Sequence, residues 1–171
     1  IRYTQKEESM TLIKNIKILL ALTAGSLVIA LGMYFDGKSI NSNSEQEALM
    51  PNFDEILSQI NSIEFKNSEE STIIKDIDDQ WLVTTAMNLP ANTELLSRFF
   101  VQIKEARVMG PKTNKPDLFF KLGLDKDNVQ TLILKSESDE VLYSLDIGDF
   151  NYKIPGTYIK ETSSDQSYLI S

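Results

Sequence analysis

Hydrophobic residues follow three different spacings along this chain. Between residues 18 and 35 they form an uninterrupted stretch without charge, ILLALTAGSLVIALGMYF. In residues 53–60 and 93–106 they recur every three or four positions, which is typical of amphipathic helices. Several later segments alternate apolar and polar residues, which is typical of strands with one buried face. The sequence therefore predicts one long apolar helix followed by a domain of mixed helices and strands.

Two amphipathic helices are predicted in this domain. The first follows Asn52, which resembles a capping box with Glu55, and its apolar positions are Phe53, Ile56, Leu57 and Ile60. The second follows Asn92 and ends before Gly110. Its broad apolar stripe consists of Leu95, Leu96, Phe99, Phe100, Ile103 and Ala106. We expect this second helix to cover one face of a sheet.

Seven strands are predicted, and most of them are bounded by polar turns. They are residues 62–67, 73–74, 81–85, 131–135, 141–147, 157–160 and 167–170. Arg107–Pro116 is expected to be a loop because it contains one glycine and two prolines, and Gly148 is expected to start a turn. A short helical turn is predicted at residues 118–122, before Gly123. Strands grouped before and after one main helix favour an α+β fold with an antiparallel sheet.

Residues 18–35 are predicted to form a transmembrane helix, because 18 helical residues extend about 27 Å, close to the thickness of a bilayer core. The basic residues before it place residues 1–17 in the cytoplasm and the C-terminal domain outside. They are Arg2, Lys6, Lys14 and Lys17. A cleaved signal peptide is the alternative, but the stretch is longer than usual and lacks a small-x-small cleavage site. Met10 is the first methionine, which leaves open whether residues 1–9 are native.

Composition also differs between the N-terminal segment and the rest of the chain. Residues 36–50 are polar and rich in Ser and Asn, which predicts a flexible linker, and residues 51–171 are expected to form the extracytoplasmic domain. Residues 36–171 contain 13 basic and 23 acidic residues, whereas residues 1–35 contain four and two. An overall charge of −8 disfavours nucleic-acid binding. The chain has no Cys and no His, which excludes thiolate and imidazole chemistry and the usual Zn, Cu and haem ligands.

Two acidic segments resemble sites of carboxylate chemistry. Asp125–Asn128 resembles the opening of a calcium loop, but Gln130 and Ser136 occupy the positions where such loops need Gly and Glu. A second segment holds three carboxylates near a predicted turn, and a solvated turn explains them better than glycosidase chemistry. These are Asp76, Asp78 and Asp79. Trp81 is expected to be a core anchor. No catalytic residue, cofactor or metal site is predicted, and the chain is not expected to be an enzyme.

Two groups of residues are candidates for contacts with other molecules. Three small residues of the apolar stretch share one helical face and could pack against another membrane helix; they are Ala21, Gly25 and Gly32. Five basic residues gather around the Gly110-Pro111 loop of an otherwise acidic domain and could contact an acidic partner or lipid headgroups. They are Lys104, Arg107, Lys112, Lys115 and Lys121. Ordinary membrane-helix composition and a charged exposed loop are the simpler alternatives.

A series of short motifs resembles the bacterial membrane-anchored family called domain of unknown function 4340. In order they are Ile63-Glu64-Phe65, Gln80 to Val83, Asn88 to Ala91, Leu95 to Phe100, Leu122-Gly123-Leu124, Leu145 to Gly148, Gly156 to Ile159 and Tyr168 to Ile170. The resemblance covers about residues 60–170. It departs from the family at Asp125 to Asn128, where members often have a proline. It implies an N-terminal membrane anchor and association with ABC-type transport components, and it transfers no catalytic residue.

The sequence as a whole therefore predicts a single-pass protein of the bacterial inner membrane. Its acidic α+β domain is expected to lie in the periplasm or outside the cell, as a non-catalytic subunit of an envelope assembly. The alternative is an extracytoplasmic module that binds a peptide, glycan or lipid.

The small-residue face of the apolar stretch gives a first testable prediction. Replacing Gly25 with Leu should leave membrane insertion intact, because Leu is more hydrophobic, but should weaken recovery of a membrane partner several-fold by separating the two helix backbones. Quantitative co-purification compares wild type, Gly25→Leu and a control substitution at Val28 on another face. Equal recovery of all three would show that the helix only tethers the domain.

Overall fold

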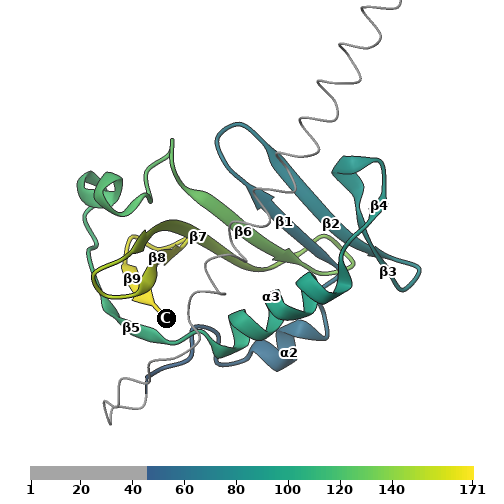
Figure 1. Ribbon diagram of the computed structural model, residues 1–171, viewed down its shortest axis with the longest axis horizontal. Helices are drawn as coiled ribbons and strands as arrows, with labels where there is room; N and C mark the ends of the chain where they lie inside the picture. The colour runs from purple at the N-terminus through teal and green to yellow at the C-terminus, as the bar shows by residue number, and fades with distance from the viewer. Residues whose placement is uncertain (1–45) are drawn as a thin grey trace, which may run out of the picture. The chain divides into compact units, whose positions relative to one another are not determined.

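The computed structural model describes residues 46–171, which form one nine-stranded antiparallel sheet with two α-helices (Figure 1). In chain order the elements are α2 (Phe53–Leu57), β1 (Ser62–Lys66), β2 (Ser71–Ile77), β3 (Gln80–Val83), the 3-10 helix η1 (Thr84–Ala86), β4 (Leu89–Pro90), α3 (Thr93–Glu105), β5 (Val108–Pro111), the 3-10 helix η2 (Pro116–Leu122), β6 (Gln130–Lys135), β7 (Val141–Asn151), β8 (Gly156–Glu161) and β9 (Ser167–Ile170). The α+β class with an antiparallel sheet is confirmed.

The expected transmembrane helix, residues 18–35, lies outside the described residues. Among residues 46–171, no helix combines the length and the apolar content that crossing a bilayer requires.

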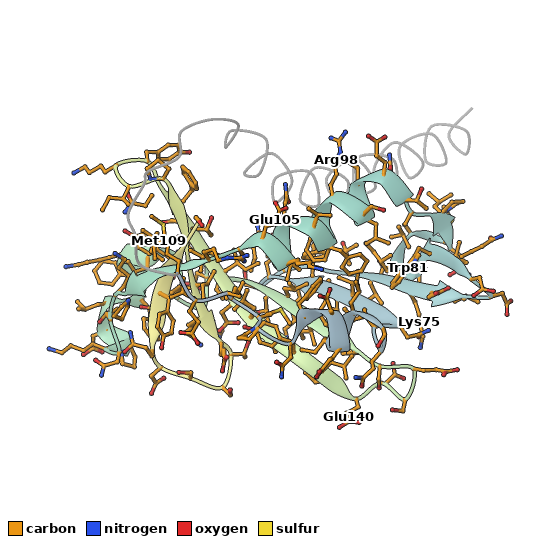
Figure 2. The ribbon with its side chains drawn as sticks, turned by 90° about the horizontal axis from the view of Figure 1, so that it is seen from below. Lys75, Trp81, Arg98, Glu105, Met109 and Glu140 are labelled. Carbon is orange, nitrogen blue, oxygen red and sulfur yellow. The ribbon has the colours of Figure 1, made fainter. Side chains whose placement is uncertain are left out.

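The sheet has the strand order β4-β3-β2-β1-β6-β7-β8-β9-β5. Its two edge strands, β4 and β5, are consecutive in the chain and are joined by α3. The helix therefore runs along one face of the sheet from one edge toward the other, as Figure 1 shows. In Figure 2, Trp81 near one edge and Met109 on the other edge lie toward opposite ends of the domain.

Helix α3 forms where the sequence predicts it, for the predicted reason. The Asn92 side chain accepts a hydrogen bond from the backbone N–H of Leu95 (3.1 Å), which satisfies one of the free donors of the first turn. Glu94 and Arg98 form an exposed ion pair one turn apart (2.6 Å). Figure 2 shows Arg98 projecting from α3 away from the sheet. The apolar stripe on the opposite side of the helix faces the core.

The core lies between α2, α3 and the helix-facing side of the sheet. Alternation in β1 directs Ile63 and Phe65 toward the helices, and the register places them beside Leu134 and Leu132 of β6. Leu132 in turn pairs with Leu145 of β7. The remaining buried members of this cluster are Met50, Phe53, Ile60, Leu96, Phe99, Ile103 and Ile159.

Aromatic rings connect the helix to the sheet. Phe99 packs edge-on against Phe65, with 5.4 Å between ring centroids, and Phe100 packs edge-on against Trp81 at 6.2 Å. Phe100 also contacts Phe53 of α2 at 6.4 Å. Edge-to-face pairs of this kind contribute about 0.5–1.5 kcal/mol beyond their buried area. The expected role of Trp81 as a core anchor agrees with this packing.

The first helix is shorter than predicted. Helix α2 ends at Leu57, and Ile60 is buried beyond its end. The predicted capping box is wrong, because the Asn52 side chain makes no capping hydrogen bond and the first turn closes on its backbone carbonyl instead. The third strand also stops early, since Thr85 belongs to η1 and its hydroxyl accepts a hydrogen bond from the N–H of Ile73.

Two segments expected to be irregular are strands. Val108–Pro111, placed in a loop by the sequence, is the edge strand β5, which pairs with β9 near the C-terminus and is bulged between Val108 and Gly110. Gly148, expected to start a turn, lies inside β7. A side chain there would collide with the carbonyl of Leu122, so this glycine permits close approach of the segment after η2. Gly110 and Pro111 thus lie in a bulged edge strand, and Gly148 lies at a close backbone contact, rather than in turns.

The folded part begins before residue 51. The N–H of Val108 donates to the carbonyl of Glu47 (2.8 Å), and the N–H of Leu49 donates to the carbonyl of Ala106 (2.9 Å). Ala48 forms an antiparallel bridge with Arg107, and Met50 is buried in the core. We call residues 47–49 the entry strap. It lies within the range that the sequence assigned to the linker.

Candidate functional site

The predicted basic group divides into two parts. Lys104 forms an ion pair with Asp54 of α2 (2.7 Å), and Arg107 donates hydrogen bonds to the backbone carbonyls of Lys104 and Ala106 (2.9 and 3.1 Å). These contacts close the C-terminal end of α3, where cations also favour the helix dipole. Lys104 and Arg107 therefore have structural partners. The three predicted membrane-packing residues, Ala21, Gly25 and Gly32, lie outside the described residues.

The other predicted cations lie on the segment that leads from β5 through η2. Lys112 and Lys115 are exposed, and the Nζ atom of Lys121 lies 5.7 Å from the centre of the Phe120 ring. The loop that carries Lys112 and Lys115 is held by Ser167 of β9, whose hydroxyl donates to the Thr113 carbonyl (2.7 Å) and accepts from its N–H (3.1 Å). These lysines are thus presented by an ordered loop.

The acidic segments form turns. The Asn128 amide donates to both carboxylate oxygens of Asp125 (3.0 and 2.9 Å), which closes the loop after η2. Asp78 and Asp79 are exposed and adopt left-handed backbone conformations in the two-residue β2–β3 turn. Within residues 46–171, no three Asp or Glu side chains are arranged to hold a metal ion.

A buried charge pair on the sheet face opposite α3 was not predicted. Asp146 of β7 and Lys160 of β8 are register partners and form an ion pair of 2.7 Å, with only 10 % and 11 % of their side chains exposed. Asp146 also accepts hydrogen bonds from the hydroxyls of Thr131 (2.8 Å) and Thr162 (3.0 Å). Lys160 lies 5.8 Å from the centre of the buried Phe119 ring of η2. The pair therefore fixes η2 against the sheet.

Local sequence gives little sign of this pair. Asp146 and Lys160 look like ordinary solvent-facing positions of alternating strands. Their burial arises because η2, distant in sequence from both strands, covers that part of the sheet. A carboxylate that already accepts two hydroxyl hydrogen bonds and an ammonium contact is well suited to a structural role.

A second charge pair lies on the same face of the sheet. Lys135 of β6 contacts Glu64 of β1 at 2.7 Å, and Ser71 donates a hydrogen bond to the same carboxylate (3.1 Å). The hydrogen bond from Lys135 holds the pKa of Glu64 below its ordinary value of 4.5. On the helix-facing side, burial raises the pKa of the Tyr143 hydroxyl to about 12.

An ordered apolar projection lies at the turn between β7 and β8. The side-chain oxygen Oδ1 of Asn151 accepts hydrogen bonds from the backbone N–H groups of Lys153 (2.9 Å) and Ile154 (3.3 Å), while its side-chain NH₂ group donates to the Tyr158 hydroxyl (2.7 Å). The turn exposes 86 % of Tyr152 and 50 % of Ile154. We call residues 152–154 the hairpin tip.

Packing also orders the tip. The Tyr152 ring packs edge-on against Phe150, with 5.0 Å between centroids. The residues after η2 lie against the strand that leads to the tip, since a side chain at Gly123 would meet Asp149. This combination of an ordered turn and the exposed Tyr152 is the best candidate for a contact surface in residues 46–171.

Comparison with known proteins leaves the family open. No family model, no curated protein and no solved structure matches this chain.

The Asp146–Lys160 pair predicts a large stability loss when only one partner is removed. Asp146→Leu should lower the free energy of unfolding by about 3–5 kcal/mol, because the Lys160 ammonium would remain buried without its partner. The double variant Asp146→Leu/Lys160→Met should regain much of this loss. Urea unfolding followed by the fluorescence of Trp81, the single tryptophan, measures both.

The matched control is Arg98→Ala, which breaks an exposed pair and should change stability by less than about 1 kcal/mol. A single variant as stable as this control would show that the Asp146–Lys160 pair does not hold the fold together.

The lowered pKa of Glu64 predicts a pH dependence. The Lys135–Glu64 contact stabilises the folded state fully above the unfolded-state pKa of 4.5. That stabilisation is lost as the pH falls through the lower folded-state pKa. Glu64→Gln should therefore lower the urea midpoint at pH 7 and reduce its decrease below pH 4.5. Glu137→Gln, at an exposed position of the β6–β7 turn, is the control. An unchanged pH profile in Glu64→Gln would contradict the assignment.

Proposed function

We propose that this protein is a membrane-anchored, non-catalytic interaction subunit of a bacterial envelope assembly, with residues 46–171 outside the cytoplasm. The apolar segment 18–35 and the basic residues before it support the anchor and its orientation. The resemblance to domain of unknown function 4340 suggests an ABC-type transport system as the assembly.

The observation that carries the interaction role is the exposure of Tyr152 on a turn fixed by Asn151. Single exposed apolar residues are common on protein surfaces. Here, however, the exposed ring is held by hydrogen bonds and by packing, which lowers the entropy lost when a partner binds. Tyrosine is also among the residues most often responsible for binding energy in protein interfaces.

A second candidate function is a binding module for an envelope peptide, glycan or lipid. The specific observation in its favour is that Ser167 holds the loop carrying the exposed Lys112 and Lys115. The two functions differ in what stabilises the protein. A ligand-binding module should gain thermal stability from a small ligand, whereas an assembly subunit should gain it only from its protein partner.

The proposed function is tested by purifying the full chain in mild detergent and quantifying co-purifying proteins by mass spectrometry. A defined membrane or envelope protein should be enriched at least tenfold over a chain truncated after residue 45, which retains the apolar segment. Equal recovery by the two chains would contradict a role for the domain in assembly. Protease added to spheroplasts should digest residues 46–171, and protection of these residues would contradict the extracytoplasmic placement.

A further inference from the structure

The edges of the sheet are poorly suited to recruiting a partner strand. Edge strand β4 has only two residues, one of which is Pro90, and edge strand β5 contains a bulge and Pro111. Proline lacks the N–H that strand pairing requires, and a bulge interrupts the register. The entry strap already occupies the start of β5. A partner is therefore more readily bound through side chains than through strand addition.

The hairpin tip projects from the domain and could enter a cavity of another molecule. Residues 152–155 are all exposed, while Gly156 directly after them is buried against β9. A projecting turn is convex, so its complement is a concave site. A symmetric contact between two copies requires a self-complementary surface, which a convex tip does not supply, and it would also bring like charges together at Lys153. The shape favours a different protein over a second copy.

The charge of the tip differs from that of the domain around it. Between Phe150 and Gly156 the only charged residue is Lys153, flanked by the exposed Tyr152 and Ile154. The domain as a whole is strongly acidic, so Lys153 is a local exception to the charge of the domain. An apolar pocket with a carboxylate at its rim would match both the apolar side chains and the lysine of the hairpin tip.

We propose that the hairpin tip inserts into an apolar, carboxylate-rimmed pocket of a different envelope protein. Tyr152 and Ile154 fill the pocket, and Lys153 pairs with a carboxylate at its rim. This inference rests on the proposed function and names the surface that performs it.

The first experiment places a photo-crosslinking residue, benzoylphenylalanine, at position 152 of the full chain in living cells. The control carries it at Met87, which is 74 % exposed beside β4, at the opposite edge of the sheet from β5. The expected product is one defined protein adduct from position 152 that is absent or at least about tenfold weaker from position 87. A lipid adduct, an adduct of two copies of this chain, equal adducts at both positions or no adduct at 152 would each overturn the proposal.

The second experiment tests the chemistry of the pocket. Tyr152→Ser and Lys153→Glu should each lower recovery of the crosslinked partner in co-purification, by about tenfold and at least about fivefold, respectively. Lys66→Glu, at an exposed position at the end of β1, makes the same charge change elsewhere and should leave recovery unchanged. Unchanged thermal unfolding midpoints would show that these exposed substitutions leave the fold intact.

The two proposals fail in distinguishable ways. If the wild-type chain recovers no partner, the proposed interaction function is wrong. If the wild-type chain recovers a partner and the tip variants recover it equally well, the interaction function stands and the assignment of the tip is wrong.

Discussion

The length of α3 limits how flat the sheet can be. A 13-residue helix extends about 20 Å, whereas nine flat strands would span about 38 Å between their outer members. The helix is joined to each outer strand by a connector of only two residues. These connectors mainly carry the chain between the sheet and the helix layer, so they add little to the distance that the helix can span. The sheet must therefore twist and curl toward α3. This curvature encloses Phe65, Phe99 and Trp81 in one core and defines which face of every strand is buried.

The two faces of the sheet are stabilised by different interactions. The face toward α3 is apolar and is held by packing. The opposite face uses cross-strand charge pairs, among which Lys135–Glu64 and Lys160–Asp146 are the most buried. Such pairs require the correct register, because a shift of one residue would move each charge to the apolar face. They therefore favour one alignment of β1, β6, β7 and β8 even where they add little net stability.

The sequence predicted those features that depend on neighbouring residues. Asn92 and the stripe from Leu95 onward identified α3, and the alternation around polar residues 136–140 identified the β6–β7 hairpin. The unpredicted features depend on residues far apart in the chain. Strand β5 exists because β9 pairs with it, Gly148 is required by Leu122, and Lys160 is covered by Phe119 of η2. Glycine and proline occur in loops, in bulges and at close backbone contacts. Their presence in the sequence therefore could not show which of these structures would form.

The same limit applies to the candidate surface. Local sequence drew attention to the lysines around Gly110, and the structure gives Lys104 and Arg107 partners at the end of α3. The order of the hairpin tip depends on the edge-on packing of Phe150 against Tyr152 and on Asn151 reaching Tyr158, a contact that requires the β7–β8 register. The exposure of Tyr152 could be inferred from a turn prediction, but its rigid presentation could not.

The entry strap has a mechanical consequence. Tension applied to the chain before Gln46 reaches the domain first through the Glu47 and Leu49 hydrogen bonds, at the junction of α3 and β5. The next resistance comes from Met50 and Phe53, which are buried in the core. A pull from the N-terminal side is thus carried directly into the helix that joins the two edges of the sheet, whereas the hairpin tip belongs to β7 and β8, to which the backbone hydrogen bonds of the strap do not lead.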